Sequence, residues 1–367
     1  MGRAERVELY GRIEEHRKRP LLVYVTSKRA GIFAHMATDA VPCIIEQIDR
    51  LPEGSNAVDF LIASYGGDPM VAWRILTLLR QRLGEKSDVA VLIPQSAYSA
   101  ATLVALGANS IVIHPNGHLG PVDMQITTYG DWGPTSFSTE DISAFLDFVR
   151  DNLRITDQEH IRALFEHACK EVGSLGIGFT ARSSKLAADL AERLLSMHMR
   201  DDEGKTRIHS IVENMSRKFQ SHAYPVSRSE AIELGLQVTK ERDEKLEGLM
   251  WKVWLDVAQE LQEDSPFDPI LELMKSAEAK KLLSPVPQLD VPIGVAGNVS
   301  YQTVLEDVAK HAKAKIEPID FQYTSAIVES ARLGHARVTR GKILSSRAQN
   351  LEIVYNVITT SRLWEKV

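Results

Sequence analysis

The stretch DVAVLIPQSAYSAATLVALGANSIVIHP, residues 88–115, decides the fold class of this chain. Its two apolar runs, 88–94 and 110–115, are short and bounded by polar or turn residues, as expected for buried strands. Between them lies a helical segment of small residues, 99–108. Ser99 opens this segment and Ser96 closely precedes it. A strand, a helix and a strand in this order predict a βαβ unit with parallel strands.

The same alternation extends toward the N-terminus. The runs PLLVYVTS and AVDFLIAS have the composition of two further buried strands, 20–27 and 57–64. Helical spacing of apolar residues predicts helices at 38–49 and at 70–84, the second ending at Gly84. We therefore predict an α/β fold with a mainly parallel sheet.

The pattern changes after Ile126. The segment TTYGDWGPTSFST, 127–139, has no periodicity, and we expect an exposed loop there. Helical patterning follows from Asp141 to about Gln237, with predicted breaks at GSLGIG and DDEG, and a capping box pairs Ser227 with Glu230.

The last third of the chain contains a predicted amphipathic helix, KLEGLMWKVWLDVAQELQED, and then a proline-rich joint. IGVA, KIEPI and LEIVYNVIT are candidate strands of a smaller α/β unit. We predict three parts: a Clp/crotonase-like peptidase domain at 1–240, a helical linker at 241–290 and a small α/β domain at 291–367.

Composition and charge limit the classes of function. The net charge is −6, which gives no reason to expect a nucleic-acid partner. The N-terminal 20 residues are too charged for a signal peptide, and no apolar run reaches the ~20 residues that cross a bilayer. Cys43 and Cys169 have no metal-ligand spacing. We expect a cytoplasmic protein with reduced thiols and no membrane insertion.

Two features suggest chemistry. Gly66 and Gly67 follow the second predicted strand, and Ser99 opens the helix after the third. The carboxyl ends of parallel strands share one edge of a sheet, so these residues should lie close together. Glycine amides could stabilise an oxyanion formed when the serine attacks a carbonyl. Each feature also has a structural explanation, a tight turn for the glycines and an N-cap for the serine.

Four segments resemble Clp-fold serine peptidases of the crotonase superfamily, especially the serine dehydrogenase proteinases, which are relatives of signal peptide peptidase A. The resemblance lies in DFLIASYGGDP, AYSAATLVALGANSIVIHPNGHLGPVDMQ, ARSSKLAADLAERLL and SHAYPVSRSEAIELGLQV, which span about 58–238. It does not cover the last hundred or so residues.

The resemblance implies a serine endopeptidase that works through an acyl-enzyme. Ser99 matches the nucleophile, Gly66 and Gly67 match the oxyanion hole, and LGPVDMQ with Asp123 matches the family element LGPIDPQ. It also implies a homo-oligomer that acts on peptide or unfolded protein. Two positions depart from the family pattern. Ala101 replaces a glycine, which narrows the space beside the nucleophile, and Met124 replaces a proline.

Several residues are candidates for the general base. Signal peptide peptidases use a lysine a few dozen residues after the serine, but this chain has none between Lys86 and Lys170. Lys185 lies in a resembling segment and would need burial to act as a base. His222 is the second candidate and His118, close to the site in sequence, the third. Asp123 could orient the base, or it could be an N-cap.

Other functions remain alternatives at this stage. The fold could serve as a non-catalytic scaffold or partner-binding module, or as a crotonase-type acyl-CoA enzyme in which the glycines stabilise an enolate. His160 and His167 have no completing carboxylate, so we predict no metal site and no cofactor. The sequence has no Walker loop, so an ATP-driven unfolding motor would be a separate protein.

Overall fold

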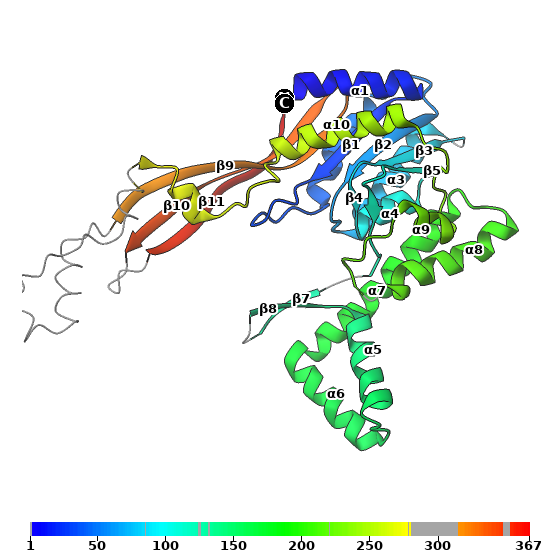
Figure 1. The fold of residues 1–367 in the computed structure, drawn as a ribbon, viewed down its shortest axis with the longest axis vertical. Helices are drawn as coiled ribbons and strands as arrows, with labels where there is room; N and C mark the ends of the chain where they lie inside the picture. The colour runs from blue at the N-terminus through cyan, green and yellow to red at the C-terminus, as the bar shows by residue number, and fades with distance from the viewer. Residues whose placement is uncertain are drawn as a thin grey trace, which may run out of the picture. The chain divides into compact units, whose positions relative to one another are not determined.

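Figure 1 shows a computed structural model that describes residues 2–84, 86–123, 126–130, 133–219, 221–277, 279, 315–347 and 353–367. The chain divides into two compact units. The first unit contains Met1–Thr26, His35–Val257 and Val328–Gly334, and the second contains Ser27–Ala34, Ala258–Ile327 and His335–Val367. The predicted boundaries at residues 240 and 290 stay predictions.

The first unit is built on four parallel strands in the order β1-β2-β3-β5. They are β1 (Leu21–Thr26), β2 (Ala57–Ala63), β3 (Asp88–Ile93) and β5 (Ser110–Ile113). Nearly every residue of these strands is buried, as is usual when helices cover both faces of a parallel sheet. The α/β fold with a largely parallel central sheet, predicted from the sequence, is confirmed.

The crossover helices are also where the sequence predicted them. The 3₁₀ turn η1 (Thr38–Ala40) leads into α2 (Val41–Asp49), and α3 (Pro69–Leu83) and α4 (Ala100–Leu106) follow β2 and β3. The Asp68 carboxylate caps α3 by accepting the Met70 N–H at 2.8 Å. Because Asp68 ends the turn that contains Gly66 and Gly67, this cap fixes where the turn stops.

A short second layer lies beyond the carboxyl ends of these strands. The strands β4 (Ser96–Ala97) and β6 (His118–Leu119) pair in parallel. Single bridges join β4 to Ser64 and β6 to Val226. The segments around residues 64, 97, 119 and 226 therefore meet in one place, although they are far apart in the sequence.

The predicted loop at 127–139 is wrong for most of its length. Residues of β7 (Ile126–Gly130) and β8 (Gly133–Phe137) form an antiparallel hairpin in which Gly130 pairs with Gly133. The strand sequences ITTYG and GPTSF alternate too weakly in polarity for their pattern to predict strands.

Helices make up the rest of the first unit. They are α5 (Thr139–Asp147), the π-helical turn η2 (Phe148–Asn152), α6 (Gln158–Val172), α7 (Ser174–Ser196), α8 (Asp202–Glu213), the π-helical turn η3 (Asn214–Lys218), α9 (Arg228–Glu233) and α10 (Glu244–Glu260). The predicted break at GSLGIG is wrong beyond Gly173, because α7 continues through Gly176 and Gly178. Burial of residues such as Ala187 and Leu190 on α7 offsets the weak helix propensity of glycine.

The N-terminal helix α1 (Arg3–Arg17), for which the sequence analysis made no prediction, is anchored by a buried charge cluster. Figure 1 shows α1 beside α10 on one side of the parallel strands. The Arg6 guanidinium donates to Glu329 at 2.9 and 3.1 Å and to Asp256 at 3.0 Å. Tyr10 donates to Glu329 at 2.7 Å, and burial together with Glu329 raises the pKa of Tyr10 well above its ordinary value. Tyr10 therefore stays neutral and keeps its proton for this bond.

We expect Arg6→Met to lower the free energy of unfolding by about 3–5 kcal/mol, because it leaves two buried carboxylates without their cation. Arg332→Met is the matched control, since Arg332 pairs with the partly exposed Glu14 at 2.8 Å. That change should cost only about 1 kcal/mol. Chemical denaturation measures both values. Equal losses in the two variants would contradict the role assigned to Arg6.

The second unit contains the short helix α11 (Pro269–Leu273), the strand β11 (Ile353–Lys366) and most of the strands β9 (Lys315–Glu329) and β10 (Gly334–Arg347). β10 and β11 are antiparallel, with an irregularity between Arg340 and Gly341. Its core includes Leu273, Phe321 and Ile343. KIEPI falls in β9 and LEIVYNVIT lies in β11 from residue 353 onward, whereas IGVA lies outside the described residues.

Within the described ranges, no helix has both the length and the apolar composition that crossing a bilayer requires. The same ranges contain no group of three or more His, Cys, Asp or Glu side chains placed to hold a metal ion. His160 pairs with Asp157 at 3.1 Å on the exposed start of α6. The predicted cytoplasmic location stays a prediction.

Candidate active site

Ser99 has an unusual backbone. It lies between β4 and α4 with φ 52° and ψ −117°, a region that non-glycine residues rarely adopt. It occupies the N-cap position of α4, yet its side chain makes no capping hydrogen bond. The residue is half-buried, and its N–H donates to the Pro121 carbonyl at 3.2 Å. The structural explanation of Ser99 as a helix cap is therefore not supported, and its hydroxyl is not used for capping.

Gly66 packs directly against Ser99. A Cβ placed on Gly66 would lie 2.6 Å from the Tyr98 carbonyl oxygen and 2.8 Å from the Ser99 Cβ, so only glycine fits. Its φ of +93° also favours glycine. The predicted proximity of the glycine pair and the serine is therefore present in the structure.

The two glycines differ in how their amides are used. The Gly66 N–H donates to Ser64 Oγ at 3.0 Å, and the Gly66 carbonyl accepts from the Met36 N–H at 2.8 Å. In the part of the chain that the structure describes, no hydrogen bond engages the N–H of Gly67 or of Ala100, the residue after Ser99. The Gly66 amide therefore differs from these two in being occupied by Ser64.

His222 and Asp123 form a close pair. His222 Nδ1 lies 2.7 Å from Asp123 Oδ1, and the two side chains are 26% and 11% exposed. The contact with the carboxylate engages Nδ1 and orients the imidazole ring, so that Nε2 is the ring nitrogen outside this pair.

Residues close in sequence to His222 and Asp123 form hydrogen bonds with residues around Ser99. Asp123 lies two residues after Pro121, whose carbonyl accepts the Ser99 N–H. His222 precedes Ala223, whose carbonyl accepts from the Tyr98 hydroxyl at 3.3 Å. Val226 and Leu119 exchange backbone hydrogen bonds at 2.8 and 3.0 Å. The residues flanking the pair thus contact the residues flanking the serine.

The other candidate bases lie in different settings. Lys185 is exposed on α7, while Ser183 and Ala187 on the same helix are buried. It lacks the burial that a lysine base requires. His118 stacks edge-on against Tyr98 at 5.4 Å, and Tyr98 stacks edge-on against the half-exposed Tyr65 at 5.5 Å. Burial and Tyr65 raise the pKa of Tyr98, so the Tyr98 hydroxyl stays protonated.

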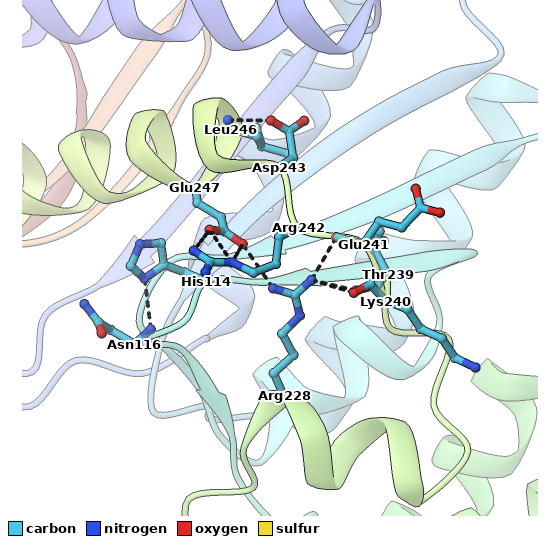
Figure 2. Close-up of polar contacts among 10 residues, drawn as sticks. All are labelled: His114, Asn116, Arg228, Thr239, Lys240, Glu241, Arg242, Asp243, Leu246 and Glu247. Atoms are coloured by element: carbon cyan, nitrogen blue, oxygen red, sulfur yellow. Dashed lines mark hydrogen bonds and ion pairs between the residues drawn. The ribbon is translucent and has the colours of Figure 1, made fainter.

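A polar cluster holds the segment that follows His222, and Figure 2 shows its members. The Glu247 carboxylate accepts from Arg228 at 3.0 Å and from Arg242 at 2.8 Å. Arg228 also donates to the carbonyls of Thr239 and Glu241, each at 2.9 Å. Hydrogen bonding from Arg242, followed by that from Arg228, lowers the pKa of Glu247. Glu247 therefore ties α9 and the connection to α10 together.

An aromatic contact completes this cluster. The His114 ring stacks on Trp251 at 4.9 Å, and its Nδ1 accepts the Asn116 N–H at 3.0 Å. Burial lowers the pKa of His114, with Arg242 acting in the same direction and Glu247 against it. Trp254, on the same helix, is buried, whereas Trp251 is partly buried.

We expect Glu247→Gln to lower the free energy of unfolding by about 1.5–3 kcal/mol at neutral pH. The native pKa of Glu247 is lowered, so its contribution is present above the unfolded value of about 4.3 and is lost as pH falls through the native pKa. Denaturation at pH 7 and near pH 3 measures the difference. Glu166→Gln, in an exposed pair with Arg162, is the control and should change little. A loss of the same size at both pH values would contradict the assignment.

We expect Gly66→Ala to destabilise the protein and abolish reaction at Ser99, because its Cβ has no space. Gly54→Ala is the matched control: Gly54 also has a positive φ, +76°, but nothing lies within 4 Å of its added Cβ. That change should cost only the backbone strain, about 1 kcal/mol, and leave Ser99 reactive. Thermal unfolding and serine-probe labelling measure both effects. Similar behaviour of the two variants would show that the contact with Ser99 is unimportant.

Comparison with known proteins finds a family model that matches part of the chain. Residues 12–135 match the model of the ClpP-like SDH-type serine proteinases. The match includes Gly66, Gly67, Ser99 and Asp123 and ends before Lys185 and His222. It confirms, over this part of the chain, the resemblance to Clp-fold serine dehydrogenase proteinases that the sequence motifs indicated.

More distant similarities extend over about half of the chain. Two uncharacterized proteins of Methanocaldococcus jannaschii are 25% identical over 189 residues and 24% identical over 207 residues. The alignments cover 52% and 56% of this chain. They cover only 54% and 62% of the two relatives, so the chain spans little more than half of their length.

Three solved structures are also similar. A membrane-bound stomatin-specific protease is 14% identical with a TM-score of 0.33, over 62% of this chain and 83% of that one. The ClpP catalytic domain of Plasmodium falciparum is 15% identical with a TM-score of 0.32, over 62% and 88%. ClpP1 of Listeria monocytogenes is 14% identical with a TM-score of 0.33, over 64% and 98%.

Sequence reasoning missed some residues of this site. Ser64 was part of the quoted SYGGD turn but had no assigned role, and Ala100 and Tyr98 were not considered. Ser64 directly precedes the turn, so its position in the motif was the available signal. The pairing of His222 with Asp123 joins residues 99 positions apart, and no local pattern encodes it.

Proposed function

We propose that this protein is a serine endopeptidase with Ser99 as nucleophile, His222 as general base and Asp123 as the group that orients His222. The observation that carries the proposal is the contact between Gly66 and Ser99, in which a strained, non-capping serine lies against a glycine turn. The family match over residues 12–135 supports the same class of enzyme.

The proposed reaction follows from these roles. The Ser99 oxygen attacks the peptide carbonyl while its proton moves to His222 Nε2. The carbonyl oxygen becomes an oxyanion, and we propose the N–H groups of Gly67 and Ala100 as its donors, since the Gly66 N–H is already bonded to Ser64. Return of the proton from His222 to the leaving amine breaks the C–N bond and leaves an acyl-enzyme. Water then attacks by the same route.

The proposed base differs from the lysine of signal peptide peptidases. His222 has a carboxylate partner at 2.7 Å, whereas Lys185 is exposed on α7. A histidine can act as a base without the burial that a lysine requires, because its unperturbed pKa already lies near neutrality. We therefore propose His222 in preference to Lys185 and His118.

The proposed substrates are peptides or unfolded protein chains, and the proposed state is a homo-oligomer. Exposed apolar side chains on the helices after β8 support an assembly, because a surface of this kind is usually covered by a partner. They include Phe145, Phe148, Leu175 and Phe179.

A fluorophosphonate probe and fluorescent casein test the proposal. We expect the wild type to be labelled and to cleave casein, and Ser99→Ala to do neither. His222→Ala and Asp123→Asn should slow labelling by about 10³–10⁴-fold, because the serine loses its base or the base loses its orientation. Lys185→Ala is the control and should react at the wild-type rate.

The outcomes separate the alternatives. Equal labelling of wild type and Ser99→Ala would overturn the peptidase proposal. A folded wild type that is neither labelled nor active would favour the non-catalytic scaffold. Loss of labelling in Lys185→Ala, with His222→Ala unaffected, would move the base to the lysine.

A further inference from the structure

Ser64 occupies a central place in the site without belonging to the proposed catalytic groups. It follows β2, is completely buried, and precedes the turn of Gly66 and Gly67. Its Oγ accepts the Gly66 N–H at 3.0 Å and lies 2.6 Å from Thr26 Oγ1 at the end of β1. Thr26 is completely buried as well. The hydroxyls of Thr26 and Ser64, at the ends of two neighbouring strands, therefore form a hydrogen-bonded chain that ends at the Gly66 N–H.

The main chain of Ser64 connects the turn to the nucleophile segment. The Ser64 N–H donates to the Ser96 carbonyl, and the Ser64 carbonyl accepts from the Tyr98 N–H, both at 3.0 Å. Tyr98 directly precedes Ser99. Ser64 thus binds the glycine turn with its side chain and the segment 96–98, before Ser99, with its backbone.

Hydrogen bonds on both sides of Gly66 fix the backbone of the glycine turn. Glycine tolerates many backbone angles, so residue type alone does not fix the φ of +93° at Gly66. Ser64 Oγ accepts the Gly66 N–H, which fixes the peptide unit before Gly66, and the Met36 N–H donates to the Gly66 carbonyl. The Gly66 carbonyl and the Gly67 N–H belong to one planar peptide unit, so the two bonds together hold the Gly67 N–H in one orientation.

We propose that Ser64, supported by Thr26, is a positioning residue for the oxyanion-binding amide of Gly67. This inference rests on the proposed function, and it adds a residue that neither touches the substrate nor transfers a proton. Removal of the Ser64 hydroxyl takes away one of the two hydrogen bonds that fix the backbone at Gly66, so the Gly67 amide is oriented less firmly. The effect falls on the transition state, in which the oxyanion exists, and not on substrate binding.

The test compares Ser64→Ala, Thr26→Val and Thr26→Ser in the full chain. The readouts are the rate constant of fluorophosphonate phosphonylation, kcat and KM for fluorescent casein, and the thermal unfolding temperature. Phosphonylation forms the Ser99 O–P bond, expels fluoride and passes the serine proton to His222. The P=O oxygen occupies the oxyanion site, so this step reports directly on the Gly67 amide.

We expect Ser64→Ala to reduce the phosphonylation rate and kcat by about tenfold to a hundredfold with KM nearly unchanged. Thr26→Val should give a smaller reduction, because the Ser64 hydroxyl remains but loses its support. Thr26→Ser keeps the hydroxyl and should restore the wild-type rate. Thr180→Ala is the matched control, since Thr180 is also fully buried and its hydroxyl donates to the Gly176 carbonyl within α7.

The results distinguish a failure of this inference from a failure of the proposed function. If Ser99→Ala abolishes labelling but folded Ser64→Ala reacts at the wild-type rate, the peptidase proposal stands and this inference is overturned. If Ser64→Ala does not fold, Thr26→Val decides: a rate equal to the wild type or to Thr180→Ala overturns the inference. A rise in KM with unchanged kcat would also overturn it, because that pattern belongs to substrate binding.

Discussion

The close approach of the Gly66 backbone to Ser99 is the constraint on which the proposed site depends. The two residues belong to successive βαβ units, and they meet because parallel strands end at the same edge of the sheet. A methyl group on Gly66 would overlap the Tyr98 carbonyl and the Ser99 side chain. The choice of glycine is thus imposed by contact as well as by backbone angle. The same contact places the backbone nitrogen of Ala100 beside Gly66.

The small residues of α4 have a related explanation. The helix is fully buried from Ala100 to Leu106, and Gly107 at its end lies against Leu76 and Leu194. Thr102 donates its hydroxyl to the carbonyls of Ala97 and Gly120, which binds the start of the helix to β4 and to the segment after β6. Small side chains let α4 approach its neighbours closely, and this rigid packing can hold Ser99 in a strained conformation.

The sequence was sufficient for the parts of the fold that depend on local patterns. The parallel strands were predicted because each is a short apolar run, and α3 because its apolar residues have helical spacing and the pattern ends at Gly84. The sequence did not predict the β7–β8 hairpin or the glycine-containing start of α7. Glycine and other turn-forming residues in both segments favoured a loop or a break. Helix α1 depends on Arg6 meeting Glu329, 323 positions away, and the role of Ser64 depends on Thr26. Contacts between distant residues leave no local periodicity to recognise.

The choice between the candidate bases shows why the sequence alone could not define the proposed site. Lys185 and His222 both lie in segments that resemble the family, so sequence alone left them equivalent. A lysine must lose solvent to act as a base, whereas a histidine needs only an oriented ring. The structure exposes Lys185 and pairs His222 with Asp123. The loop that carries His222 is then bonded at Val226 to β6, while Arg228, just beyond it, binds Glu247 on α10. The folded environment therefore distinguishes the two bases by solvent exposure and by anchoring, and both favour the histidine.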